Sequence, residues 1–223
     1  MLLAVDTSTQ WIGLALYDGV QVISELVWQT QSHHTVELAP AVEGLLQRAG
    51  IQTRDLSALG VALGPGSFTS LRIGLAVVKG LSLAMRLPVV GIPSLDALAA
   101  AQPVVKMPLA AVLQAGRIRL AVGWYDVEGG HWKPQGEAKV TTLDELSSSI
   151  HSPTLVAGEL GELERQVLGR KRKNVVLASP AQSLRRPSFL AELAWERWQA
   201  GKVDEVVSLA PIYLHVADPI PEP

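Results

Sequence analysis

The stretch that decides the fold is residues 64–85, GPGSFTSLRIGLAVVKGLSLAM. It opens with a glycine- and proline-rich loop, and Ser67 can cap a helix by accepting a hydrogen bond from a free backbone N–H. The residues from there to Met85 predict one long helix that is apolar nearly all round, with only a narrow polar wedge that includes Arg72 and Lys79. Such a helix is covered on more than one side. We expect one cover to be the protein's own sheet and the other to be a second chain.

The composition limits the function classes. The chain has 223 residues, 48% of them hydrophobic, a net charge of −2 and no cysteine. It is long enough for one large or two small domains. Disulfides, thiolate metal sites and cysteine nucleophiles are excluded, and the charge gives no general footprint for nucleic acid or anionic membrane. A carboxylate as early as Asp6 does not fit a signal peptide, and charges interrupt the longest apolar run. We therefore expect a cytoplasmic protein without a membrane segment.

Apolar runs and turn signals predict two halves of similar plan. In the first half we expect strands over residues 2–5, 11–17, 20–28, 59–63 and 89–92, and helices over 35–48, 67–85 and 94–101. In the second half we expect strands over 109–113, 120–126, 131–140, 154–157 and 175–178, helices over 143–148 (capped by Thr141), 162–168 and 187–200, and an extended piece over 210–214. The repeated βββαβα order predicts an α/β protein of two similar lobes, residues 1–102 and 103–223, with a flexible tail from about residue 217.

Two segments can present backbone N–H groups to a phosphate. The turn after the first strand also offers a carboxylate that can approach a metal, and the loop before the central helix can hold an anion at the helix start. The candidate residues are Asp6, Thr7, Ser8, Gly64, Gly66 and Ser67. For the turn, the alternative that we favour is a polar turn in which Asp6 bonds its own backbone. For the loop, we favour an ordinary helix entry, because it lacks the Gly-Lys-Ser/Thr of a P-loop.

Other polar clusters carry weaker signals. His33 and His34 are adjacent on a predicted helix start and so do not face one another, and no third ligand is apparent nearby. The basic run at residues 170–173 is typical of a solvated turn, with contact to RNA phosphates as the alternative. A Gly-x-Ser-x-Gly elbow for nucleophilic catalysis is absent from the sequence.

Four segments resemble the TsaB family, once labelled YeaZ. They are LLAVDTSTQWIGLALYDG (residues 2–19), HHTVELAPAVEGLL (33–46), GVALGPGSFTSLRIGLAVVKGLSLAMRLPVVGIPSLDALA (60–99) and APIYL (210–214). The resemblance runs almost continuously over residues 2–101 and is sparse beyond, and GPGSFT-x-LRIG is its most specific motif. It implies a two-lobed actin/Hsp70/sugar-kinase-like (ribonuclease H-like) fold. It also implies a role in making threonylcarbamoyladenosine next to the anticodon of tRNAs that read codons starting with A.

The resemblance further implies partners and a division of labour. The catalytic paralogue TsaD transfers the threonylcarbamoyl group, and TsaB is required beside it together with the ATPase TsaE, so that contact with tRNA is indirect. TsaD-like chains carry an Asn-His-Leu-Glu-Gly-His stretch whose histidines bind metal, whereas residues 93–98 read PSLDAL here. Ser94 and Leu98 replace the ligands, and the hairpin at 113–117 has one glycine and no carboxylate. We therefore expect a non-catalytic scaffold without metal or cofactor; the alternative is a stand-alone weak nucleotide hydrolase or metallopeptidase-like enzyme.

The central helix is the predicted partner interface. Ala76, Gly80 and Ala84 recur every four residues and form a flat ridge, and a glycine inside a helix costs about 1 kcal/mol relative to alanine. Close approach of another backbone is a reason to keep it. The interface residues that we predict are Leu71, Leu75, Ala76, Val78, Lys79, Gly80 and Ala84, with Val42 and Leu46 from the preceding helix. We expect the face to serve a homodimer and to be reused for TsaD; the alternative is that both faces are buried inside this chain.

Overall fold

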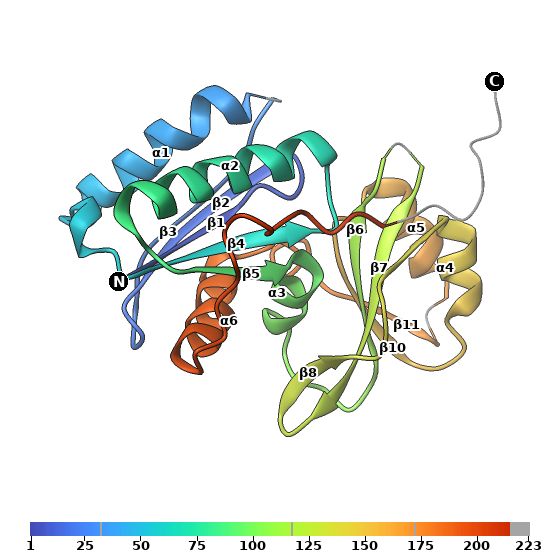
Figure 1. The fold of residues 1–223 in the computed structure, drawn as a ribbon. Helices are drawn as coiled ribbons and strands as arrows, with labels where there is room; N and C mark the ends of the chain where they lie inside the picture. Colours follow the sequence, from blue (N-terminus) through green and yellow to red (C-terminus); the bar gives the residue numbers. More distant parts are fainter. Residues whose placement is uncertain (32, 117, 172, 215–223) are drawn as a thin grey trace.

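The chain folds around two mixed β-sheets that share a five-strand plan, to which the second sheet adds a sixth strand (Figure 1). The computed structural model describes residues 1–31, 33–116, 118–171 and 173–214. The first sheet has the order β3-β2-β1-β4-β5 and the second β8-β7-β6-β10-β11, with β9 also paired to β7. In both, the first three strands in sequence are antiparallel and the last two add in parallel. The internal repeat predicted from the sequence is therefore confirmed at the level of the sheets.

The elements follow the predicted order closely. The strands are β1 (Leu2–Asp6), β2 (Trp11–Tyr17), β3 (Val22–Gln29), β4 (Ala58–Gly64), β5 (Val89–Pro93), β6 (Leu109–Gln114), β7 (Leu120–Glu128), β8 (His131–Pro134), β9 (Lys139–Thr141), β10 (Thr154–Gly158) and β11 (Val175–Leu177). The helices are α1 (His34–Ala49), α2 (Phe68–Met85), α3 (Ser94–Ala100), α4 (Leu143–Ser149), α5 (Glu162–Gly169) and α6 (Pro187–Gln199), with a short 3-10 turn over Thr53–Asp55.

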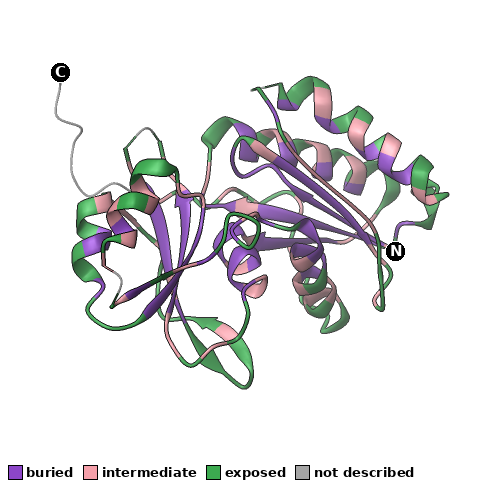
Figure 2. Cartoon of the chain, turned by 180° about the vertical axis from the view of Figure 1, so that it is seen from behind, coloured by how far each residue is buried: buried purple, intermediate pink, exposed green. Residues whose placement is uncertain are grey.

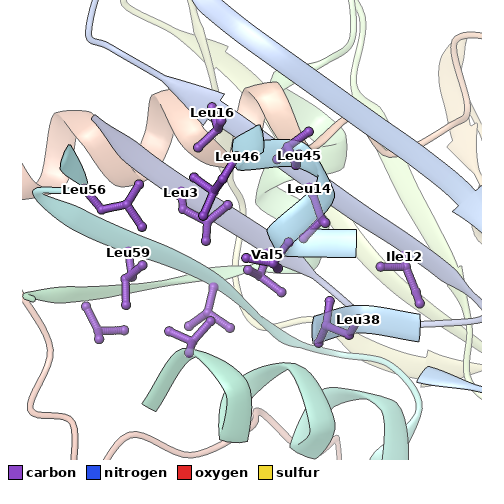
Figure 3. Packing of buried hydrophobic residues seen from close by; sticks show 14 of the residues in the cluster. Leu3, Val5, Ile12, Leu14, Leu16, Leu38, Leu45, Leu46, Leu56 and Leu59 are labelled. Atoms are coloured by element: carbon purple, nitrogen blue, oxygen red, sulfur yellow. The ribbon is translucent and has the colours of Figure 1, made fainter. Parts of the chain in front are cut away.

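Helices cover both faces of each sheet. On the first sheet, α1 and α2 lie on one face and α6 on the other (Figure 1). Leucines of α1 meet side chains of β1 and β2 in the core beneath it, as Figure 3 shows for Leu38, Leu45 and Val5. On the second sheet, α4 and α5 cover one face and α3 the other. The central strands of both sheets are accordingly mostly buried, whereas the edge strands β3, β8 and β9 and the outer faces of the helices are intermediate or exposed (Figure 2).

Helix α2 begins where its sequence predicts. Ser67 is its cap, because its Oγ accepts a hydrogen bond from the Ser70 N–H at 3.4 Å. Leu71, Leu75 and Val78 are buried against the first sheet. By length and composition this helix could cross a membrane, and 33% of its residues are buried within the chain.

Two local predictions in the second half are wrong by a small margin. The run 131–140 forms two strands rather than one, because Pro134 has no N–H to donate to a ladder and Gly136 turns the chain at φ 124°. The cap of α4 is Thr142 rather than Thr141, since β9 continues through Thr141. Thr142 and Glu145 form a reciprocal capping box, with the Glu145 carboxylate accepting from the Thr142 N–H at 2.7 Å.

The predicted division after residue 102 separates the two sheets but misplaces the last helix. After β11 the chain crosses back, and α6 packs on the first sheet, where Leu190 and Ala194 share a core cluster with Leu2 and Ala4. The segment after α6 stays there, since the Ile212 N–H donates to the Leu63 carbonyl oxygen at 2.7 Å. We call the first sheet with α1, α2 and α6 the first lobe, and the second sheet with α4 and α5 the second lobe. The predicted tail from about residue 217 lies outside the described residues.

Candidate functional site

The predicted turn and loop meet at one edge of the first sheet. Because β1 and β4 pair in parallel, the turn that follows Asp6 and the loop that follows Gly64 leave the sheet side by side. The Ser67 N–H donates to the Ser8 carbonyl oxygen at 2.6 Å, so the two segments are in direct contact. They border a cleft of about 1200 Å³ between the lobes, whose opposite wall includes residues 114–116 and 158–161 of the second lobe.

Several backbone donors of this turn and loop are bonded within the chain. The Ser8 N–H donates to Asp6 Oδ1 at 2.8 Å, and the Gly64 N–H donates to Ser94 Oγ at 3.0 Å. Gly66 lies so close to the turn that a Cβ there would stand 2.0 Å from the Ser8 carbonyl oxygen. The N–H groups of Ser8 and Gly64 are thus used within the chain, and the close approach at Gly66 leaves no room for a phosphate between the turn and the loop.

The hydroxyl groups of the turn are engaged as well. Thr7 Oγ1 donates to the Ser70 carbonyl oxygen at 2.8 Å, next to Gly74, where a Cβ would stand 2.2 Å from that hydroxyl. Ser8 Oγ and Ser94 Oγ lie 2.5 Å apart. Both side chains join the turn to the start of a helix, α2 for Thr7 and α3 for Ser8. Phosphate binding by these residues stays a prediction, against which all of these contacts speak.

The carboxylate of Asp6 is paired with an arginine from the far end of the chain. Arg185 Nε donates to Asp6 Oδ2 at 2.8 Å, and the two residues are 5% and 4% exposed. Burial alone would raise the pKa of Asp6, but the charge of Arg185 and hydrogen bonds from Ser8 and Arg185 lower it below its usual value. Burial also opposes the charge of Arg185, but its two neighbouring carboxylates raise its pKa, so the pair is ionised. A carboxylate held in this way is occupied and unavailable to a metal.

The other arms of Arg185 reach the second lobe and the turn. Arg185 Nη1 forms an ion pair with Glu159 Oε1, and Arg185 Nη2 donates to Thr9 Oγ1 at 3.0 Å. Thr9 Oγ1 in turn donates to Glu159 Oε1 at 2.6 Å. Sequence reasoning missed Arg185 and Glu159. The only local sign was an arginine pair directly before the helix-starting Pro187, and nothing there indicates a partner near residue 6.

The positions that would ligate metal in a TsaD-like chain have other roles here. Ser94 is fully buried and holds the turn and the Gly64 loop, and Leu98 is fully buried in the core of the second lobe. His34 is buried with Nε2 at 2.9 Å from the Thr9 carbonyl oxygen, whereas His33 is exposed. Within the described parts of the chain, His, Asp and Glu side chains form no group of three or more suited to a metal ion. The residues at hand do not fit a metal centre.

The predicted partner interface divides into core and surface. Five of its residues are buried in the chain's own core, which speaks against their predicted assignment to an interface: Leu71, Leu75, Val78, Val42 and Leu46. The reason is that α2 and α1 turn these side chains onto the first sheet. Ala76, Gly80 and Ala84 are exposed, together with Leu83 at 70%, and a Cβ at Gly80 would meet nothing within 4 Å. Lys79 lies at the edge, where Nζ donates to the Val207 carbonyl oxygen at 3.2 Å.

Sequence comparison assigns the family. A chain from Bacillus subtilis named tRNA threonylcarbamoyladenosine biosynthesis protein TsaB is 32% identical over 224 residues, which is 97% of this chain and 95% of that protein. The chain belongs to the TsaB family. The family model of tRNA N6-adenosine threonylcarbamoyltransferase, TsaD, matches residues 22–169, in keeping with the predicted kinship of TsaB with TsaD. This chain is therefore a TsaB homologue involved in threonylcarbamoyladenosine modification of tRNA.

Solved structures agree with this assignment. YeaZ from Pseudomonas aeruginosa superposes with a TM-score of 0.79 at 27% identity, covering 96% of this TsaB homologue and 99% of that chain. A ROK hexokinase from Thermus thermophilus superposes with a TM-score of 0.50 at 14% identity, covering 90% of this chain and 99% of that one. The second likeness concerns the fold alone. The predicted two-lobed actin/Hsp70/sugar-kinase-like fold is confirmed.

Proposed function

We propose that this TsaB homologue is a non-catalytic subunit that activates a TsaD-type threonylcarbamoyltransferase, with TsaE as a further component of the complex. It holds the TsaD-type partner in its active arrangement while that partner modifies the adenosine next to the anticodon. Its own contact with tRNA is therefore indirect. It needs no cofactor or metal of its own, and it acts in the cytoplasm. In isolation, the exposed face of α2 that we assign to the TsaD contact serves a homodimer.

The exposed face of α2 is the observation that carries this proposal. Ala76, Gly80 and Leu83 lie on the solvent side of a helix whose opposite side is in the core. Small side chains let another backbone approach closely, and an exposed leucine among them adds apolar area. The sequence has no carboxylate between Asp55 and Asp96, so the charges along α2 are cationic only. This combination fits a partner that presents an apolar face with acidic residues at its rim.

The base of the cleft supports the absence of catalysis. Asp6 is paired with Arg185, and the N–H groups of Ser8, Gly64 and Ser67 donate to acceptors within the chain. A nucleotide hydrolase or a metallopeptidase would need free acceptors, donors or ligands at this place. We therefore favour the scaffold over a stand-alone enzyme.

The decisive experiment places a charge on the exposed face of α2 without disturbing the core. Gly80→Arg and Leu83→Arg are the probes, since both positions are exposed and Gly80 has open space above it. Leu163→Arg on α5 is the matched control, an exposed leucine (65%) on a helix of the second lobe. Association with TsaD is measured by light scattering and titration, and function by tRNA modification with TsaD and TsaE present.

We expect all three variants to fold and the two α2 variants to bind TsaD at least about thirtyfold more weakly, because a charge desolvated in an interface costs 2 kcal/mol or more. Leu163→Arg should bind as the wild type does. Full association of both α2 variants would refute the interface. Hydrolysis of labelled ATP, or tRNA modification by the isolated chain, would instead favour the stand-alone enzyme.

A further inference from the structure

The charge network at the base of the cleft joins the two lobes. Asp6 and Thr9 belong to the first lobe, at the end of β1 and in the turn after it, whereas Glu159 directly follows β10 of the second lobe. Arg185 bonds to all three, and Thr9 also bonds directly to Glu159. One guanidinium group with three occupied nitrogens therefore bridges residues from both sides of the cleft.

Arg185 is presented by the segment on which the chain crosses from β11 back to α6. This segment is anchored on the second lobe by Arg165 of α5, whose Nη1 donates to the Ala178 carbonyl oxygen at 3.0 Å and whose Nη2 donates to Ser183 Oγ at 3.2 Å. The segment then enters α6 on the first lobe. Arg185 thus stands at a crossing point whose two ends are fixed to different lobes.

Another tie between the lobes is apolar and lies at α3. Leu95 and Leu98 pack into the core of the second sheet, whereas Ala97 of the same helix packs with α6 and the first sheet. Apolar contacts of this kind tolerate small rotations, whereas a buried ion pair is lost once the charges part. Movement of the lobes about α3 would separate Asp6 from Glu159 and break the bridge through Arg185.

We propose that Arg185 is an interlobe latch, a built-in cation that takes the place of a ligand between Asp6 and Glu159 and holds the cleft at a fixed width. The lobes of this chain then need no nucleotide or metal ion to set their arrangement, and any partner meets a surface of constant shape. This inference rests on the contacts of Arg185 and is independent of the proposed function.

The test measures the distance between the lobes in solution. The chain has no cysteine, so spin labels can be attached at Gln47→Cys on α1 and Ser148→Cys on α4, both exposed. Pulsed electron–electron double resonance then gives the distribution of distances between the two labels, in the labelled chain with Arg185 and in its Arg185→Gln variant. The neighbouring Arg186→Gln is the matched control, because Arg186 is 54% exposed and pairs with Glu25 within the first lobe.

We expect a narrow distribution of label distances for the chain with Arg185 and for Arg186→Gln. For Arg185→Gln we expect a broader distribution that includes longer distances. A folded Arg185→Gln with an unchanged distribution would overturn the latch. Should Arg185→Gln not fold, Glu159→Gln decides, since it removes the negative charge that faces Arg185 Nη1 at a less buried position and should broaden the distribution too. If Glu159→Gln also unfolds, or folds with an unchanged distribution, the network is ordinary core support and the proposal fails.

Discussion

Replacing Asp6 by alanine tests whether this residue holds the structure or serves chemistry. The change removes the 2.8 Å ion pair with Arg185 and the 2.8 Å hydrogen bond from the Ser8 N–H, both in a buried site. Loss of one partner of a buried ion pair costs about 3–5 kcal/mol, and loss of the acceptor for a buried N–H costs about 1–3 kcal/mol. Because Arg185 keeps Glu159 and Thr9, we expect a total loss of about 3 kcal/mol rather than the sum of both ranges.

The assay is urea unfolding followed by circular dichroism and by the fluorescence of the six tryptophans. With a slope of about 2–3 kcal/mol per molar urea, the midpoint should fall by about 1–1.5 M. Asp6→Asn is the companion variant, since an amide keeps an acceptor for Ser8 and loses only the charge. Under conditions where both variants are folded, both should support tRNA modification with TsaD and TsaE. An Asp6→Ala protein of unchanged stability that is inactive with TsaD and TsaE would refute this reasoning.

Three further predictions concern Ser94, Gly80 and the pH dependence of stability. Ser94→Ala should destabilise the chain by about 2 kcal/mol in urea unfolding, because the Gly64 N–H and the Ser8 hydroxyl both lose a buried partner; an unchanged midpoint would contradict it. Gly80→Ala should raise the unfolding free energy by about 0.5–1 kcal/mol, because its Cβ enters open space, and yet weaken association measured by light scattering. The pKa of Asp6 is lowered in the folded state, so its contribution to the free energy of unfolding is complete above about pH 4 and is lost as the pH falls through the folded pKa. The free energy of unfolding, measured in urea at falling pH, should therefore decrease less for Asp6→Ala than for the wild type.

Local patterns were enough for the elements and for the candidate turn and loop. The central helix has its cap at Ser67 and its end at Met85 because both signals act within a few residues, through backbone hydrogen bonds and helix propensity. The parallel pairing of β1 and β4, which brings the Asp6 turn to the Gly64 loop, is a long-range contact, because β2, β3 and α1 lie between the two strands in the chain. The sequence therefore marked the turn and the loop as two separate candidates, and only the fold brings them into contact.

Which face of a helix meets the core was beyond reach. Helix α2 is apolar on both sides, so its periodicity could not say that Leu75 faces the sheet and Gly80 faces solvent. The same ambiguity assigned Val42 and Leu46 of α1 to an interface, although they are buried under the helix. Only the packing of α1 beside α2 on one face of the first sheet settles these orientations.

By itself, the sequence determined the two-lobed α/β plan, its repeated strand order and the TsaB resemblance, because each is written in local periodicity and in contiguous motifs. Only the tertiary structure decided the content of the cleft. Arg185 reaches Asp6 across almost the whole length of the chain, and α6 returns to the first lobe on the same crossing. Such contacts depend on how the chain closes on itself, and a single buried charge pair leaves no periodic trace in the residues around it.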